Sequence, residues 1–195
     1  MQLNINTLSE EYSKKNILVI GDIILDEYVY GKVDRISQEA PVPIVAIDHQ
    51  EFKPGGAANV ALNLSGLGAN VTLIGIVGKD TNQIELNKCF TSQDNINNQI
   101  IDCDTRQTSI KTRIIADGRQ IARLDSEVKE EISDEYISLL IDVFNNNCNN
   151  VDGIIIQDYN KGLLTSKLIK YIIGHARDKS IPVYVVPKNN NFKSY

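Results

Sequence analysis

The sequence predicts an α/β protein with a parallel sheet, covering helices and a small antiparallel β-sheet inserted outside the main one. Short apolar runs that end at glycine or polar residues alternate with segments whose apolar residues recur at helical spacing. This alternation is typical of buried parallel strands joined by helices. Two insertions, at about residues 31–51 and 98–125, combine short strand-like runs with turn residues, and we expect them to form the small sheet.

The composition excludes several classes of protein. Hydrophobic residues make up 42% of the 195 residues and charged residues 23%, which is enough apolar content to bury a core. The longest apolar run is far shorter than the ~20 residues of a membrane helix, and the first residues lack the pattern of a signal peptide. A net charge of −5 argues against sequence-independent nucleic-acid binding. We therefore expect neither nucleic acid nor a membrane as a partner.

The cysteines and histidines indicate no metal centre. The cysteines are three in number, lie far apart and form no CxxC pair. A disulfide framework or zinc site is therefore not predicted, and a reducing, cytoplasmic location fits better. The two histidines, His49 and His175, lie in unrelated contexts, so no metal ligand set is expected.

The first half of the chain begins with a buried strand. Residues 17–20 form an apolar run closed by glycine, which is typical of a central strand. Residues 23–30 continue the strand-like pattern. Pro41 and Pro43 then favour an extended or edge conformation, and residues 44–47 predict another strand.

A glycine pair at positions 55 and 56 opens the first predicted helix. Apolar residues recur at helical spacing after the pair until Gly68, which is placed to end the helix. Residues 71–77 predict the next buried strand, and residues 81–90 predict a weaker helix.

Residues 98–125 predict short strands and a hairpin. Strand-like runs surround Ile100 and cover residues 109–116 and 120–124. The dipeptide Asp117-Gly118 separates the last two runs and is a good hairpin signal.

The rest of the chain alternates helix and strand, which implies a parallel sheet with helices over it. Ser133 can cap a helix that ends in the asparagine-rich stretch 145–150. Its predicted apolar face holds Tyr136, Leu139, Leu140 and Val143. A strand at 153–156, a helix at 166–177 and a strand at 182–186 follow.

The first candidate site follows the first strand. Asp22 and Asp26 come directly after it, and ligands of open parallel sheets bind beyond the carboxyl ends of strands. A carboxylate there can accept two hydrogen bonds from neighbouring hydroxyls of a sugar. Alternatively, Asp22 caps a turn and Asp26 is solvated, which is the more frequent outcome when such residues are taken alone.

The second candidate site is the start of the first helix. Small residues such as Gly55 and Gly56 let a ligand reach backbone N–H groups, and Asn59 adds a donor and an acceptor. The alternative is a tight turn before a closely packed helix. The patterns GxGxxG and GxxxxGK[ST] do not occur in the sequence.

The third candidate site is the segment Asp158-Tyr159-Asn160-Lys161-Gly162, just after another strand. Lys161 can neutralise a phosphate as a point charge, and Lys188 follows the last strand in the same way. The alternative is an ordinary polar loop. Three cations on strand-like segments have acidic neighbours and form either a solvated face or a pocket for a sugar phosphate. They are Lys111, Arg113 and Arg123, with Asp125 and Glu127 nearby.

The order of the motifs is more informative than any one of them. The segments ILVIGDIILD (17–26), RISQEAPVP (35–43) and PGGAANVA (54–61) closely resemble the ribokinase-like (PfkB) carbohydrate kinases. The RISQEAPVP segment is similar to that of the kinases of D-glycero-β-D-manno-heptose 7-phosphate, which act in ADP-heptose and lipopolysaccharide core synthesis. The segments SIKTR, QIARLDSE, QDYNKG and the Pro187-Lys188 pair continue the resemblance.

The resemblance implies a ribokinase-like fold and ATP-dependent phosphorylation of heptose 7-phosphate at its anomeric hydroxyl, with Mg²⁺. It implies that the insertions form a lid sheet, which in this superfamily often also makes a homodimer interface. The implied sugar-binding residues are Asp26, Gly55, Gly56 and Asn59, with Lys111, Arg113 and Arg123 on the lid and phosphate side. Asp158, Lys161 and Lys188 would lie on the nucleotide or phosphate side.

The sequence also departs from the family pattern. The motif GAGD, which supplies the anion hole and the catalytic base, does not occur in it, Val186 stands where the family usually has Asp, and Asn160 replaces a glycine. Asn tolerates a left-handed conformation, so the change at Asn160 is mild.

We therefore expect residues 1–195 to form the N-terminal part of one kinase domain, incomplete at its C-terminus. The expected partners are a sugar phosphate and either a second copy through the lid sheet or a separate C-terminal half. The base would lie on that missing half, and we expect little turnover alone. The alternatives are a non-catalytic sugar-phosphate-binding or lid-mediated interaction fragment, and a kinase for another sugar.

Overall fold

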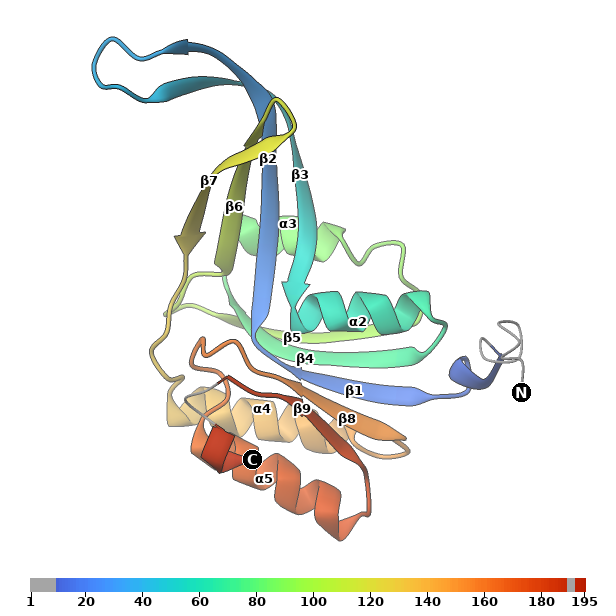
Figure 1. Cartoon of the computed structure of the whole chain (residues 1–195). Helices are drawn as coiled ribbons and strands as arrows, with labels where there is room; N and C mark the ends of the chain where they lie inside the picture. Colours follow the sequence, from blue (N-terminus) through green and yellow to red (C-terminus); the bar gives the residue numbers. More distant parts are fainter. Residues whose placement is uncertain (1–9, 189–191) are drawn as a thin grey trace.

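A five-stranded parallel sheet covered by helices forms the base of the molecule, and a four-stranded sheet projects away from it (Figure 1). The computed structural model describes residues 10–188 and 192–195. The parallel sheet has the order β5-β4-β1-β8-β9. Its strands are β1 (Asn16–Gly21), β4 (Asn70–Gly78), β5 (Ile96–Cys103), β8 (Gly153–Gln157) and β9 (Val183–Val186).

Four helices cover the two faces of this sheet, as Figure 1 shows. They are α2 (Ala57–Gly66), α3 (Thr81–Lys88), α4 (Asp134–Asn147) and α5 (Ser166–Asp178), and a 3₁₀ turn, η1 (Phe192–Ser194), follows. Successive side chains of β1 enter opposite cores, because strand side chains alternate between faces. Leu18 and Ile20 pack with α4 and α5, whereas Val19 packs with α2 and α3. The predicted parallel sheet with covering helices is confirmed.

The four-stranded sheet is mixed rather than wholly antiparallel. Its order is β3-β2-β6-β7, where β2 spans Ile23–Ile36, β3 Pro43–Gly56, β6 Ser109–Ala116 and β7 Arg119–Ser126. The two hairpins are antiparallel, but β2 and β6 run parallel where they meet. The turn at Asp117 and Gly118 has φ angles of 51° and 74°, which confirms the predicted hairpin.

The bounds of the two insertions differ from those predicted. Residues 96–103 form β5, which pairs with β4 at the edge of the parallel sheet, so the expected insertion at 98–125 begins too early. The residues of β5 are largely polar and only partly buried, as an edge strand permits. The sequence pattern therefore did not indicate that β5 belongs to the main sheet. The first insertion is longer than 31–51, because β2 and β3 continue down to the parallel sheet.

The buried face of α4 also differs in detail. Ile137, Leu140 and Phe144 are buried, whereas the predicted Leu139 is 42% exposed. Ser133 occupies the N-cap position, but its side chain makes no capping hydrogen bond. No helix in the described part of the chain is long and apolar enough to cross a membrane.

Candidate functional site

The carboxyl ends of β1 and β8 meet at the point where the order of the parallel strands reverses. From β1 the chain proceeds to β4 and β5 on one side of the sheet and then returns to β8 and β9 on the other side. Open α/β sheets leave a crevice at such a reversal, beyond the carboxyl ends of the strands. Asp22 follows β1 and Asp158 follows β8, so two of the predicted sites converge here.

Asp22, at the end of β1, forms hydrogen bonds with the loop that follows β8. It is 2% exposed, and its Oδ2 accepts hydrogen bonds from the backbone N–H groups of Tyr159 (2.7 Å) and Lys161 (3.1 Å). Its Oδ1 is buried with no hydrogen-bond partner among the described residues. Burial raises the pKa of Asp22, although the two backbone hydrogen bonds act in the opposite direction. The expected simple turn cap is therefore a buried link between β1 and the loop after β8.

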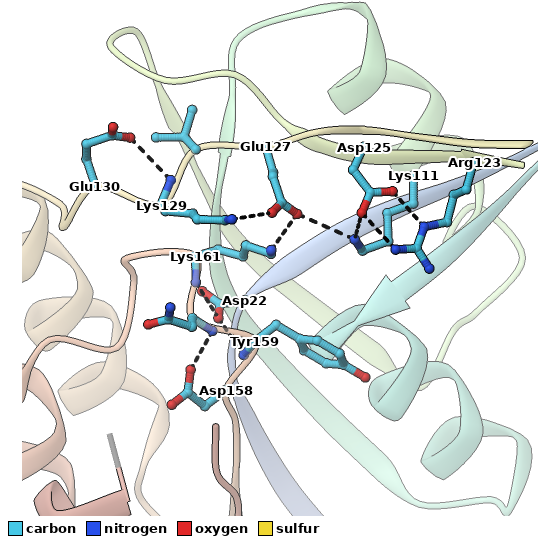
Figure 2. A network of polar contacts seen from close by, with 12 residues as sticks. Asp22, Lys111, Arg123, Asp125, Glu127, Lys129, Glu130, Asp158, Tyr159 and Lys161 are labelled. Atoms are coloured by element: carbon cyan, nitrogen blue, oxygen red, sulfur yellow. Dashed lines mark hydrogen bonds and ion pairs between the residues drawn. The ribbon is translucent and has the colours of Figure 1, made fainter. Parts of the chain in front are cut away.

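The loop after β8 has a fixed backbone that places Lys161. Asn160 has a φ of 57°, the left-handed conformation that the sequence allowed for, and Gly162 has a φ of 81°. A Cβ atom on Gly162 would collide with the carbonyl oxygen of Glu130. The carbonyl of Lys161 accepts a hydrogen bond from the Arg106 guanidinium at 2.6 Å. The Lys161 side chain is consequently 11% exposed and directed at the four-stranded sheet (Figure 2).

The carboxylate of Asp158 also makes hydrogen bonds that stabilise this loop. It accepts hydrogen bonds from the backbone N–H of Asn160 (2.7 Å) and from the Tyr195 hydroxyl (2.9 Å). Burial raises the pKa of Tyr195, and the hydrogen bond to Asp158 acts in the same direction. Asp158 is 3% exposed, and these hydrogen bonds hold the loop in place.

Asp26 and the glycine pair meet at the base of the four-stranded sheet. Asp26 on β2 forms an ion pair with Arg113 on β6 at 2.5 Å, and the two side chains are 20% and 23% exposed. A Cβ atom on Gly55 would collide with the Asp26 carboxylate, so glycine is required for this approach. The Tyr28 ring lies 5.2 Å from the Arg113 guanidinium, at a distance that supports a cation–π contact.

The second glycine starts α2. Gly56 is the N-cap with a φ of 59°, and the backbone N–H of Ala57 donates to the carbonyl of Asp22 at 2.9 Å. The start of α2 thus packs directly against the end of β1, as in the alternative of a tight turn before a closely packed helix.

A cluster of charged side chains connects the two sheets (Figure 2). Lys111 on β6 contacts Asp125 at 2.8 Å and Glu127 at 3.4 Å, and Lys161 also pairs with Glu127. Arg123 binds Asp125 at 2.8 Å. Burial opposes ionisation of Glu127, but the hydrogen bonds from the lysines outweigh it and lower the pKa of Glu127. The hydrogen bond from Lys111 lowers the pKa of Asp125.

The structure brings most of the predicted residues into one region. Asp26, Gly55, Gly56, Lys111, Arg113, Arg123, Asp158 and Lys161 lie at the strand ends or on the adjoining polar face of the four-stranded sheet. Asn59 and Lys188 are exposed. Asn59 lies within α2, and the Lys188 ammonium lies 5.9 Å from the centroid of the Tyr159 ring.

Sequence reasoning missed the central position of Glu127 and the anchoring role of Arg106. Glu127 lies two residues beyond Asp125, so strand alternation alone would have put both carboxylates on the face that carries Lys111. Arg106 gave no comparable signal, because it lies in a loop and acts through backbone carbonyls.

A different hollow, of about 590 Å³, lies at the amino ends of the parallel strands. It is lined mainly by asparagines, several of which bond one another or the backbone, as Asn97 does with Asn147. Its described lining includes no lysine or arginine to meet a phosphate. We therefore place the candidate site at the carboxyl ends.

No group of three or more histidine, cysteine or acidic side chains that could hold a metal ion occurs among residues 10–188 and 192–195. The carboxylates at the candidate site instead contact cations or backbone N–H groups. The site as described can accept hydrogen bonds from hydroxyl groups and offer ammonium groups to an anion.

Comparisons with known proteins identify the family of the chain. A family model described as pfkB family carbohydrate kinase matches residues 14–194. The chain is 39% identical over 191 residues to bifunctional protein HldE of Koribacter versatilis and 38% identical over 181 residues to that of Helicobacter pylori. These matches cover 98% and 93% of the chain but 39% of each relative. The chain thus spans about two fifths of the length of these curated relatives.

Solved structures show the same fold at low sequence identity. A possible 1-phosphofructokinase from Thermotoga maritima superposes with a TM-score of 0.68 at 19% identity, over 87% of this chain and 53% of that one. Ribokinase of Arabidopsis thaliana, complexed with ribose and ATP, gives a TM-score of 0.55 at 14% identity, over 88% and 53%.

Proposed function

The chain belongs to the pfkB family of carbohydrate kinases, and we propose that it forms the sugar-binding part of an ATP-dependent kinase of heptose 7-phosphate. The observation that supports this most directly is the meeting of Asp26 and Gly55 beside the cations Lys111 and Lys161. A sugar phosphate has hydroxyl groups at one end and a dianionic phosphate at the other. In this region the Asp26 carboxylate can accept hydrogen bonds from the hydroxyl groups, and the lysines can meet the phosphate.

We propose that the Asp26 carboxylate accepts hydrogen bonds from sugar hydroxyls while Arg113 holds it in position. The ion pair with Arg113 uses Oδ1 of Asp26, and we propose that Oδ2, which lies against Gly55, meets the ligand. Gly55 and Gly56 would let the sugar ring approach the backbone at the start of α2. The phosphate would bind among Lys111, Lys161 and Arg123, because ammonium and guanidinium groups are its usual partners.

The choice of heptose 7-phosphate rests on the RISQEAPVP segment and on the similarity to bifunctional HldE proteins. We propose phosphorylation at the anomeric hydroxyl, as a step towards ADP-heptose in the cytoplasm. ATP and Mg²⁺ are the phosphoryl donor and metal that the resemblance implies. No group of three or more histidine, cysteine or acidic side chains is gathered for the metal among the described residues, and the part we assign to these residues is to bind and orient the sugar phosphate.

A second function, association of two copies through the four-stranded sheet, is favoured by its exposed apolar side chains. They are Ile36 on β2, Ile44 and Ile47 on β3, and Ile121 and Leu124 on β7, and Val42 in the turn between β2 and β3 is exposed as well. Four of these residues, Ile36, Val42, Ile44 and Ile47, lie at the same end of the β2–β3 hairpin, and contiguous exposed apolar surface often marks an interface. We propose that this sheet is a lid that also forms a homodimer contact, in a kinase or in a non-catalytic sugar-phosphate-binding protein.

Titration calorimetry tests the sugar site. The chain should bind heptose 7-phosphate, and Asp26→Ala should weaken binding about tenfold, because a hydrogen bond to a charged acceptor contributes ~1.5–3 kcal/mol and ~1.4 kcal/mol is a factor of ten. Glu51→Ala is the matched control, since Glu51 is an exposed carboxylate that pairs only with Lys53 on the same sheet.

Equal affinities of the folded wild type and Asp26→Ala would show that Asp26 is only a structural partner of Arg113. Tighter binding of fructose 6-phosphate or glucose 6-phosphate than of heptose 7-phosphate would indicate a kinase for another sugar.

A further inference from the structure

Glu127 is the only carboxylate of the described chain that contacts three lysines, which come from different parts of the sequence. Its Oε2 accepts hydrogen bonds from both Lys161 and Lys111, and its Oε1 lies 3.3 Å from the ammonium of Lys129. Lys161, Glu127 and Lys111 are 11%, 15% and 18% exposed, so water screens these charges only in part. One oxygen of the Glu127 carboxylate therefore contacts the ammonium groups of both Lys111 on β6 and Lys161 in the loop after β8 (Figure 2).

The backbone that carries Glu127 is held independently of its side chain. Glu127 begins the segment between β7 and α4, and Ile132 in that segment donates its N–H to the Gly162 carbonyl at 3.0 Å. Arg106 bridges the carbonyls of Val128 and Lys161. The Glu127 side chain can consequently rotate away from the lysines without moving the segment or the loop after β8.

The cluster has an excess of positive charge even with Glu127 in place. Lys111, Arg123, Lys129 and Lys161 face two carboxylates, those of Asp125 and Glu127. Each of these cations has a carboxylate partner, but the six side chains together carry a net charge of +2. A phosphate monoester carries up to two negative charges and several acceptor oxygens, so it would satisfy both the charge and the hydrogen-bond donors that converge on Glu127.

We infer that Glu127 is a built-in competitor for the phosphate subsite: it occupies Lys111 and Lys161 in the free protein and is displaced when a phosphate-bearing ligand binds. This inference rests on the proposed function for the identity of the sugar, but the competition concerns the phosphate group alone. The exchange links ligand binding to the contact between the two sheets, because the phosphate then replaces Glu127 as the group that joins β6 to the loop after β8.

The inference predicts that removal of the Glu127 carboxylate strengthens phosphate binding. Glu127→Gln should bind inorganic phosphate about tenfold more tightly than the wild type, which corresponds to about 1.4 kcal/mol. The same variant should be less thermally stable without phosphate, since three lysines lose a counter-ion, and should gain more stability from added phosphate. Glu85→Gln is the matched control, because Glu85 pairs with Lys88 on the exposed surface of α3.

The experiment is titration calorimetry and thermal unfolding with inorganic phosphate, at an ionic strength held constant with sodium chloride. Glu127→Asp keeps the charge but shortens the side chain, and it should also bind phosphate more tightly than the wild type. Equal or weaker phosphate binding by both Glu127 variants would overturn the inference and show that Glu127 is a structural or ligand-binding carboxylate.

A titration with heptose 7-phosphate separates this inference from the proposed function. If the Glu127 variants bind inorganic phosphate more tightly but no protein prefers heptose 7-phosphate to other phosphate esters, the competitor role holds and the proposed substrate fails. If the wild type prefers heptose 7-phosphate but the Glu127 variants bind phosphate no better, the substrate holds and the competitor role fails.

Discussion

Two substitutions of Asp22 should distinguish the effect of its charge on folding stability from the effect of its hydrogen bonds. Asp22→Ala removes the acceptor of two backbone N–H groups, those of Tyr159 and Lys161, in a buried setting. Each unsatisfied buried donor costs ~1–3 kcal/mol, so for two donors we expect a loss of about 2–6 kcal/mol of folding stability. For a chain of this length that lowers Tm by roughly 5–20 °C, since ~1 kcal/mol corresponds to ~2–4 °C.

Asp22→Asn should behave differently, because an amide has the shape of the protonated acid. Its oxygen can accept the same two N–H groups, and its NH₂ group replaces the oxygen that has no described partner. The variant should therefore retain part of the stability that Asp22→Ala loses, because the buried NH₂ group has no described acceptor.

The pH dependence of stability gives the sharper test. Burial raises the pKa of Asp22 in the folded state above its ordinary value near 3.8, so the folded protein holds a proton that the unfolded chain releases in the window between the two values. Stability of the wild type should fall as the pH rises through this window, which begins near pH 3.8. Asp22→Asn lacks this dependence, so its stability relative to the wild type should improve from about pH 4 upward.

Urea unfolding of the three proteins between pH 4 and pH 8 measures this, with Asp48→Ala as the control for an exposed carboxylate. The reasoning would be refuted by parallel pH profiles of the wild type and Asp22→Asn, or by an Asp22→Ala variant as stable as Asp48→Ala.

Three further predictions concern the loop, the chemistry and the sheet edge. Gly162→Ala should lower stability by about 1–3 kcal/mol, because φ is positive and Cβ meets the Glu130 carbonyl; an unchanged urea midpoint would contradict this. The chain with ATP, Mg²⁺ and heptose 7-phosphate should form no bisphosphate above background, because the GAGD motif that would supply the anion hole and the base does not occur in the sequence; turnover proportional to protein concentration in a coupled assay would disprove it. β9 is an edge strand whose Tyr184 and Val186 are 63% and 51% exposed, so the chain should self-associate; a monodisperse monomer in light scattering would count against this.

The sequence predicted the elements of the fold because strong local signals coincide at most of them. Apolar runs closed by glycine located β1, and the Asp117-Gly118 pair located the β6–β7 hairpin. β5 was misplaced because an edge strand does not need a continuous apolar run, and its polar sequence resembles an inserted strand. The parallel pairing of β2 with β6 has no local signal, since it depends on two segments more than 80 residues apart in the chain.

The candidate site was predictable as a set of residues but not as a set of contacts. The order of motifs selected Asp26, Lys111 and Arg113, yet only the structure shows that Arg113 holds Asp26. The role of Asp22 depends on backbone N–H groups about 140 residues later in the chain, which no sequence pattern reveals.

Mapping the ligand on the backbone amides tests the central claim most directly. A ¹⁵N-labelled sample titrated with heptose 7-phosphate should show its largest amide shift changes at residues 22–26, 55–57, 111–113 and 158–162, which surround the carboxyl ends of β1 and β8. Changes centred instead on the asparagine-lined hollow at the amino ends, near Asn16, Asn95 and Asn147, would contradict the account. The absence of any change at millimolar ligand would contradict it as well.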